Sequence, residues 1–125
     1  MRIFICEDEI NFRPRNAILK ALEGHDLTVA TTKDEAIAIY KGGYDLLLLD
    51  HDMRGLFDLS SHPSTAYHFV TWLVAQPFKK KPRVILHSQN PEGRNNMRRE
   101  LIKGGFRCVS EFPFSPSYVD YLLTI

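Results

Sequence analysis

Short apolar runs alternate with amphipathic segments from one end of the chain to the other. The clearest run is Leu46–Leu49, four leucines followed directly by Asp50. A continuous apolar run of this kind is typical of a central parallel strand that is covered on both faces. Other segments with clustered apolar residues are predicted as strands of similar length. The five predicted strands are residues 2–6, 27–31, 44–50, 83–88 and 106–110.

Apolar residues recur at helical spacing in the segments between these strands. Prolines suit the first turn of a helix, short polar residues suit the N-cap, and glycines often end helices. In the last helix the inward face is predicted to be Val119, Leu122 and Leu123. The predicted helices begin in the first turn at Pro14, at Lys33, at the capping residue Ser64, at Asn90-Pro91 and at Ser115-Pro116, with a long polar loop over residues 51–63.

Five alternations of strand and helix favour a doubly wound parallel sheet, because short connections and right-handed crossovers leave few other arrangements. We expect a flavodoxin-like α/β fold with strand order 2-1-3-4-5, formed as one domain over residues 1–125. In such sheets ligands bind at the carboxyl ends of the strands, near the point between the first and third strands where the order reverses.

Composition and charge narrow the possible partners. The chain has 125 residues, 44% hydrophobic and 25% charged, with a formal net charge of +1. This near-neutral balance argues against extended nucleic-acid binding and against capture by an anionic membrane. No apolar run approaches the ~20 residues that a membrane span needs, and the chain enters a strand at once without a signal peptide. We therefore expect a cytoplasmic protein in which Cys6 and Cys108 are buried, reduced thiols.

Acidic residues follow two strands that are neighbours in the predicted sheet. Glu7 and Asp8 follow the first strand, and Asp50 follows the third. Carboxylates at such short range cannot all stay ionised without help, so we expect either a bound cation or a raised pKa. Mg²⁺ or another divalent cation is the predicted cofactor, held by Glu7, Asp8 and Asp50. The alternative is an acidic rim that is simply solvated.

Two histidines flank this acidic group. His51 follows the third strand and His87 lies near the end of the fourth. Imidazole titrates near neutrality, so both are candidate proton-transfer residues, with Asp50 and Asp52 orienting them or holding the metal. Alternation along the fourth strand places His87 and Ser88 on opposite faces, so both reach one pocket only if the strand has already bent there.

A candidate phosphate site lies at the start of the fourth helix. Ser88 and Asn90 are short hydrogen-bonding residues, and Arg94 adds a positive charge in the first helical turn. With the backbone N–H groups of the helix start, they are predicted to bind the oxygens of a phosphate. The alternative for Asn90 is a plain N-cap.

These residues together resemble the receiver domains of bacterial response regulators. The resemblance spans essentially the whole chain and rests on the acidic residues after the first strand, Leu49-Asp50, Ser88, and Phe112-Pro113-Phe114. It implies that Glu7 and Asp8 bind Mg²⁺, that Asp50 accepts a phosphoryl group, and that Ser88 responds to it. Receivers carry a lysine just before the proline that follows the fifth strand, whereas here Glu111-Phe112 precedes Pro113. This departure weakens the case for ordinary phosphoacceptor signalling.

Two further motifs are similar to the branch called cyclic-phosphate-processing receiver domains. They are Leu49-Asp50-His51-Asp52-Met53, and His87-Ser88-Gln89-Asn90 with Gly93. The resemblance implies a phosphoesterase that acts on a small cyclic phosphate derived from a nucleotide or ADP-ribose. Two alternatives remain open at this point: an atypical receiver that signals through a protein partner, and a metal-dependent hydrolase that uses Asp50 as its nucleophile.

Overall fold

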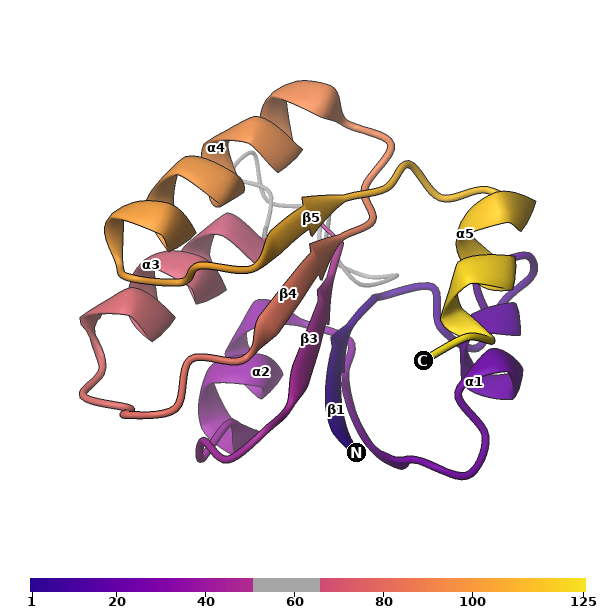
Figure 1. Cartoon of the computed structure of the whole chain (residues 1–125), viewed down its shortest axis with the longest axis horizontal. Helices are drawn as coiled ribbons and strands as arrows, with labels where there is room; N and C mark the ends of the chain where they lie inside the picture. Colours follow the sequence, from indigo (N-terminus) through magenta and orange to yellow (C-terminus); the bar gives the residue numbers. More distant parts are fainter. Residues whose placement is uncertain (51–65) are drawn as a thin grey trace.

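Five parallel strands form one sheet in the order β2-β1-β3-β4-β5, which confirms the predicted topology (Figure 1). The structure is a computed structural model, and it describes residues 1–50 and 66–125. Every strand pairing is parallel, so all carboxyl ends meet at one edge of the sheet. The strands are β1 (Arg2–Cys6), β2 (Asp26–Ala30), β3 (Leu46–Leu49), β4 (Arg83–Leu86) and β5 (Val109–Glu111).

In residues 1–50 and 66–125, five helices cover both faces of this sheet. Helices α2, α3 and α4 pack on one face, and α1 and α5 pack side by side on the other (Figure 1). The helices are α1 (Ala17–Ala21), α2 (Lys33–Ile39), α3 (Ala66–Ala75), α4 (Pro91–Lys103) and α5 (Pro116–Leu122). In the described part of the chain, no helix is long and apolar enough to cross a membrane.

Alternation along the strands divides the core into two halves. Beneath α2, α3 and α4 the core is rich in aromatic residues, with Phe4, Tyr40 and Phe69 at its centre. Beneath α1 and α5 it is mainly aliphatic, with Ile5, Leu48 and their neighbours packed against Tyr118. The sheet is therefore sealed on both faces, as the run of four leucines in β3 predicts.

Most predicted strand boundaries shift by one or two residues, and the larger differences are the starts of β5 and α1. Strand β5 begins at Val109, because pairing with β4 starts there rather than at Phe106. Cys108 precedes this pairing and is exposed, so the prediction that it is buried was wrong, whereas Cys6 is buried as predicted. Pro14 lies in a turn before α1, which begins at Ala17 rather than in the first helical turn at the proline.

The inward face of α5 is rotated from the predicted one. Tyr118 and Leu122 are fully buried, Val119 is half-buried, and Leu123 is 63% exposed. Leu122 is therefore inward as predicted, but its partner four residues earlier on the same helix face is Tyr118, whereas the prediction placed Val119 and Leu123 there. This rotation brings the Tyr118 hydroxyl into the core next to the carboxyl edge of the sheet.

Candidate functional site

A row of polar residues crosses three adjacent strands at the carboxyl edge of the sheet. Glu7, Asp50 and His87 each come directly after the aligned positions Cys6, Leu49 and Leu86. Their backbone N–H groups extend the parallel ladder by one step, from Asp50 to Cys6 O at 3.0 Å and from His87 to Leu49 O at 2.9 Å. By alternation the row continues the face that carries Ile5, Leu48 and Ile85, so the three side chains lie under α1 and α5.

Glu7 is the centre of this row and is completely buried. Its Oε1 accepts a hydrogen bond from Arg15 Nη1 at 2.8 Å and lies 3.2 Å from His87 Nε2. Arg15 Nη1 is also 3.9 Å from Asp50 Oδ2, so one guanidinium serves two carboxylates. A buried carboxylate needs such partners, because leaving it unpaired would cost several kcal/mol.

His87 is held on both ring nitrogens. Its Nδ1 lies 3.2 Å from the Tyr118 hydroxyl, and the two rings stack with centroids 5.4 Å apart. An ionised Glu7 carboxylate can only accept, so we assign the proton of the neutral imidazole to Nε2, which donates to Glu7, and Nδ1 then accepts from the Tyr118 hydroxyl. The result is a fully buried chain of hydrogen bonds that runs from Tyr118 through His87 to Glu7.

Burial changes the proton affinity of each member of the row. It lowers the pKa of His87 to about 4, so the imidazole is neutral near pH 7. Burial, reinforced by the neighbouring Glu7 carboxylate, raises the pKa of Asp50 to about 8. The pKa of Glu7 is also raised by burial, and its hydrogen bond with Asp50 and the Arg15 charge oppose that rise. Glu7 and Asp50 therefore titrate as a coupled pair in which Asp50 carries the shared proton.

A small cleft opens above this row. It has a volume of about 200 Å³, and we call it the strand-end cleft. Three of its lining residues carry carboxylates, one carries a guanidinium and one an amide. The residues that line it are Asp8, Glu9, Arg15, Asp50 and Gln89. The cleft lies at the β1/β3 reversal of strand order, where the fold is expected to bind ligands.

The residues predicted to bind phosphate do not line this cleft: Ser88 and Asn90 lie in the turn between β4 and α4, and Arg94 lies in the first turns of α4. Ser88 is buried, and its hydroxyl accepts a hydrogen bond from Asn90 N–H at 3.0 Å. Asn90 caps α4 by accepting from Gly93 N–H at 3.0 Å, which is the alternative role that the sequence left open. Arg94 donates to the backbone oxygen of Ser88.

Glu111, at the end of β5, lies close to the position where receivers carry a lysine, and its charge is balanced by two arginines. Glu111 Oε1 lies 3.4 Å from Arg94 Nε, and its Oε2 lies 3.8 Å from Arg98 Nη1. Its negative charge is thus paired with cations from α4, and its side chain does not line the strand-end cleft. The cation in the cleft is instead Arg15, which comes from the other face of the sheet.

Sequence reasoning missed Arg15 and Tyr118. Arg15 stands in the turn before α1, and no motif marks it, because its place depends on how that turn folds back over the sheet edge. Tyr118 follows Ser115 by three residues and precedes Leu122 by four, so a different choice of helix face would have found it. His51 and Asp52, predicted as catalytic, lie outside the described residues, as does Ser64.

The acidic residues suit a hard divalent cation. One ligand atom from each of Glu7, Asp50 and His87 lies within 4.8 Å of the others. Glu7 and His87 are already engaged with Arg15 and Tyr118, whereas the carboxyl groups of Asp8 and Asp50 border the strand-end cleft. Carboxylate oxygens with several waters are the ligands that Mg²⁺ prefers, so the cleft fits such an ion.

Solved structures with the same fold are response regulators and receiver domains. The phosphorylated cyanobacterial phytochrome response regulator RcpA matches with a TM-score of 0.65 at 17% identity, covering 98% of this chain and 86% of that one. The Thermotoga maritima regulator TrrA, solved with Mg²⁺ and BeF, matches with a TM-score of 0.62 at 22% identity over 98% of each chain. The Francisella response regulator 1452 receiver domain matches with a TM-score of 0.61 at 22% identity, covering 98% of this chain and 90% of that one.

These structural similarities establish the receiver fold, and a match to a family model establishes the branch of receiver domains. A search of curated proteins found no match. The model for the cyclic-phosphate processing receiver domain matches residues 2–103. This range includes the whole polar row, all five residues that line the strand-end cleft, and the turn into α4. With the receiver topology in place and this match over most of its length, the chain belongs to the cyclic-phosphate processing receiver domain family.

Proposed function

We propose that the chain hydrolyses a small cyclic phosphate, derived from a nucleotide or ADP-ribose, in the strand-end cleft. The observation that carries the proposal is the Arg15 guanidinium, which lines the cleft beside Asp8 and Asp50. Its side chain is only 12% exposed, so it is a partly desolvated cation at the edge where this fold binds ligands. The family match supports a phosphate as the group that this cation meets.

Charge decides what else the cleft needs. A phosphate anion is repelled by the carboxylates of Asp8 and Glu9 in the cleft and of Glu7 behind it, and Arg15 offsets only part of that charge. We propose that Mg²⁺ or a similar ion, held by Asp8 and Asp50 with Glu7 behind them, offsets the rest. Such an ion, when bound, polarises phosphoryl oxygens. Arg15 is well shaped for the same anion, because a guanidinium can pair with two phosphate oxygens at once.

Ring opening requires two proton movements. A water oxygen forms a bond to phosphorus and gives up a proton, while the bond from phosphorus to one ring oxygen breaks and that oxygen takes up a proton. We propose His51 as a proton-transfer residue and Asp52 as its partner, since both directly follow Asp50. His87 is proposed to contribute as a positioning residue through Glu7, because it is fully buried between Glu7 and Tyr118.

The β4–α4 turn is proposed to shape one wall of the site. Ser88, Asn90 and Arg94 hold this turn in place through mutual hydrogen bonds, and Gln89 projects from it into the cleft. We therefore propose that Ser88, Asn90 and Arg94 act on the phosphate mainly by fixing the backbone around Gln89.

Turnover of cyclic phosphates tests the proposal directly. Nucleoside 2′,3′-cyclic phosphates and ADP-ribose cyclic phosphates are incubated with the protein, with and without Mg²⁺, and followed by ³¹P NMR. We expect Arg15→Ala to lower kcat/KM by about 10²-fold or more, as for loss of a group that stabilises developing charge. His51→Ala is expected to cost about 10²–10⁴-fold.

Arg13→Ala is the matched control, because Arg13 is an exposed arginine two residues away that does not line the cleft. It should leave turnover unchanged. Absence of turnover with every substrate in both metal conditions, or equal rates for Arg13→Ala and Arg15→Ala, would contradict the proposal.

A signalling receiver is the second candidate. Asp50 borders the cleft at the end of β3, in the fold that the phosphorylated regulator RcpA also has. This function would require a protein partner and a stable phosphoryl group on Asp50. Incubation with acetyl phosphate and Mg²⁺ followed by intact-mass measurement tests it, with Asp50→Asn as control. A persistent adduct that Asp50→Asn abolishes supports signalling, and its absence alongside turnover of a cyclic phosphate supports the hydrolase.

A further inference from the structure

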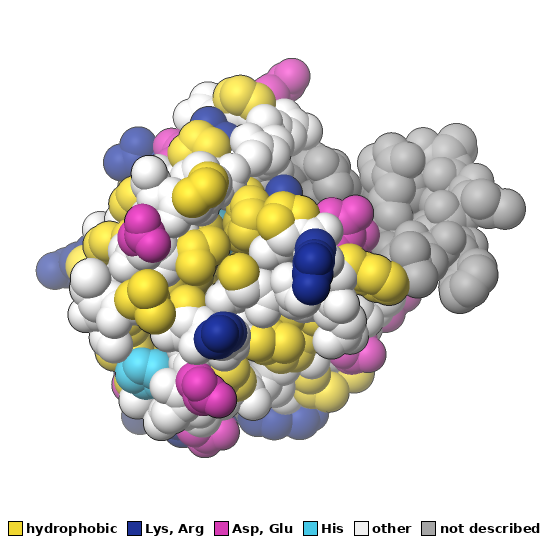
Figure 2. All heavy atoms as spheres, turned by 90° about the vertical axis from the view of Figure 1, so that its right-hand side faces the viewer, with side chains coloured by type: hydrophobic (Ala, Val, Ile, Leu, Met, Phe, Trp, Pro, Cys, Tyr) yellow, Lys and Arg dark blue, Asp and Glu magenta, His cyan; other side chains and the backbone are white. Residues whose placement is uncertain are grey.

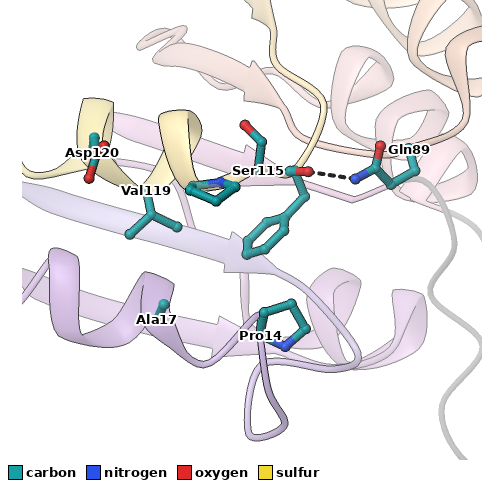
Figure 3. Close-up of a pocket in the computed structure, with 8 residues that line it drawn as sticks. Pro14, Ala17, Gln89, Ser115, Val119 and Asp120 are labelled. Carbon is teal, nitrogen blue, oxygen red and sulfur yellow. Dashed lines mark hydrogen bonds between the residues drawn. The ribbon is translucent and has the colours of Figure 1, made fainter.

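We propose that the pocket between α1 and α5 binds the nucleoside part of the phosphate ester whose phosphate occupies the strand-end cleft; this inference rests on the proposed function. The pocket has a volume of about 550 Å³, and we call it the interhelix pocket. Small-molecule sites typically have volumes of about 300–1,000 Å³. The residues that line it are Pro14, Ala17, Gln89, Phe114, Ser115, Pro116, Val119 and Asp120 (Figure 3).

The interhelix pocket and the strand-end cleft share a wall. Gln89 lines both, and its Nε2 donates a hydrogen bond to the Phe114 backbone oxygen at 2.5 Å (Figure 3). Arg15 lines the cleft, and its guanidinium carbon lies 4.3 Å from the centre of the Phe114 ring, which lines the pocket. A ligand whose phosphate meets Arg15 would therefore have its remaining atoms beside Phe114.

The interhelix pocket differs in chemistry from the cleft. Two prolines, an alanine, a valine and a phenylalanine ring make most of its walls apolar, whereas the cleft is lined by charged and amide groups. Hydrophobic side chains gather on this face of the molecule, over α1 and α5 (Figure 2). An aromatic ring and flat proline surfaces suit a planar heterocycle. Every nucleobase has a flat π-face that can stack on such surfaces, so stacking alone does not select one base.

The two ends of the interhelix pocket are polar. Gln89 lies at the end next to the cleft, and Asp120 lies at the opposite end, with Val119 on α5 facing Ala17 and Pro14 on the α1 side (Figure 3). An exposed carboxylate at the far end can accept hydrogen bonds from an amino group of a base or from a hydroxyl. Cation, apolar wall and acceptor thus follow one another as a nucleotide would require them: the cation for its phosphate, the wall for its planar base, and the acceptor for an amino or hydroxyl group of the nucleoside.

Binding of parts of the proposed ligand can test the interhelix pocket and the phosphate site independently of each other. The probes are inorganic phosphate, adenosine and adenosine 2′,3′-cyclic phosphate, and the readout is NMR of the Ala17 and Val119 methyl groups together with the Arg15 side-chain N–H signals. We expect adenosine to shift the methyl signals, phosphate to shift the Arg15 signals, and the cyclic nucleotide to shift both. The cyclic nucleotide should bind about tenfold tighter than phosphate or better, a difference of about 1.4 kcal/mol.

Variants on α5 provide the matched comparison. Val119→Trp places a large ring in the pocket and should weaken cyclic-nucleotide binding by about tenfold or more while leaving phosphate affinity within about twofold. Leu123→Trp is the control, because Leu123 is exposed on the same helix and does not line the pocket. If Val119→Trp does not fold, Asp120→Ala replaces it, and a loss of about threefold for the cyclic nucleotide alone is expected.

The outcomes distinguish the two proposals. If phosphate binds but Val119→Trp or Asp120→Ala leaves cyclic-nucleotide affinity unchanged, the subsite is overturned and the phosphate site stands. If neither phosphate nor the cyclic nucleotide binds, the proposed function is contradicted, and the adenosine arm then decides the subsite. Adenosine shifts at Ala17 and Val119 support it, and their absence overturns it.

Discussion

The two faces of the sheet are built from the same five strands, but they carry different side chains at the carboxyl ends of those strands. Under α2, α3 and α4 the core is dense with aromatic rings, and Phe4, Tyr40, Phe69 and Trp72 contact one another edge to face or stacked. Under α1 and α5 an aliphatic core gives way to the buried polar row of Glu7, Asp50 and His87. The aromatic face therefore serves mainly to stabilise the fold. On the opposite face, burying charged groups costs stability but holds those groups in fixed positions.

The largest expected effect lies on the aromatic face. Phe69→Ala removes a fully buried ring that lies 5.7 Å from Phe4, 5.7 Å from Tyr40 and 5.9 Å from Trp72, measured between ring centroids. We expect the free energy of unfolding to fall by about 3–5 kcal/mol, because the lost contacts leave a cavity. Urea unfolding followed by circular dichroism measures it.

Leu123→Ala serves as the control for this prediction, since Leu123 is 63% exposed. A surface change of this kind should stay within about 0.5 kcal/mol. A loss below about 1.5 kcal/mol for Phe69→Ala would show that the aromatic face can collapse around the cavity and is not the stabilising half of the molecule.

Tyr118→Phe tests the polar chain on the opposite face. The change removes the hydroxyl that lies 3.2 Å from His87 Nδ1, and the fully buried imidazole then loses its hydrogen-bond donor. We expect a loss of about 1–3 kcal/mol in unfolding free energy, the cost of leaving a buried polar atom unsatisfied. An unchanged midpoint in urea would mean that the chain from Tyr118 to Glu7 does not hold the row together.

The pH dependence of stability is the next smaller effect. The folded state holds the Asp50 proton up to a pKa of about 8 instead of the ordinary 3.8, so its contribution is full below pH 3.8 and is lost as pH rises to 8. His87 has a folded pKa of about 4 instead of 6.5, so its contribution is present above pH 6.5 and is lost as pH falls to 4. Between pH 4 and 6.5 the two slopes oppose each other.

Of these two slopes, the one from Asp50 remains between pH 6.5 and 8. At about 1.4 kcal/mol per pH unit, stability should fall by at most about 2 kcal/mol across this interval. Urea midpoints measured in EDTA at several pH values check it, and Asp50→Asn should flatten the curve. A curve for the wild type that is already flat through this interval would show that Asp50 is ionised in the folded protein, and would contradict the prediction.

How much the sequence predicts also differs between local patterns and tertiary contacts. The leucine run of β3 identifies a central strand by itself, and parallel alignment then places Asp50 beside Glu7 and His87. Such inferences succeed because the periodicity of a strand and the alignment of its neighbours are regular. The polar row at the carboxyl edge follows from these two regularities alone.

The positions of some side chains depend on how segments pack over one another, and the pattern of apolar and polar residues does not reveal this packing. Arg15 reaches the cleft only because the turn before α1 returns over the sheet edge, which no local signal records. Tyr118 enters the core because α5 presents a face rotated by one residue from the predicted one. Cys108 is exposed because β5 begins to pair at Val109, just after this cysteine and three residues later than predicted. The apolar composition around Cys108 carries no information about that register.

The smallest expected effect gives the sharpest comparison of the two faces. Tyr40 and Tyr118 are both buried tyrosines, but the Tyr40 hydroxyl is buried with no hydrogen-bond partner among the described residues. A hydroxyl in this state gains nothing to offset its lost hydration, whereas the Tyr118 hydroxyl has His87. Removing the hydroxyl oxygen from each tyrosine therefore measures how much a buried phenol contributes to the unfolding free energy with and without a hydrogen-bond partner.

For Tyr40→Phe we expect a change between zero and a gain of about 1 kcal/mol in unfolding free energy. The ring keeps its contacts with Phe4 and Phe69, and the only losses are the oxygen's dispersion contacts and a void smaller than a water molecule. Urea unfolding of both tyrosine variants under one condition makes the test, because the ring, the deleted atom and the method are shared. A loss for Tyr40→Phe as large as that for Tyr118→Phe would mean that its hydroxyl has a partner too, and the centre of the aromatic core would then hold a polar contact like the one on the opposite face.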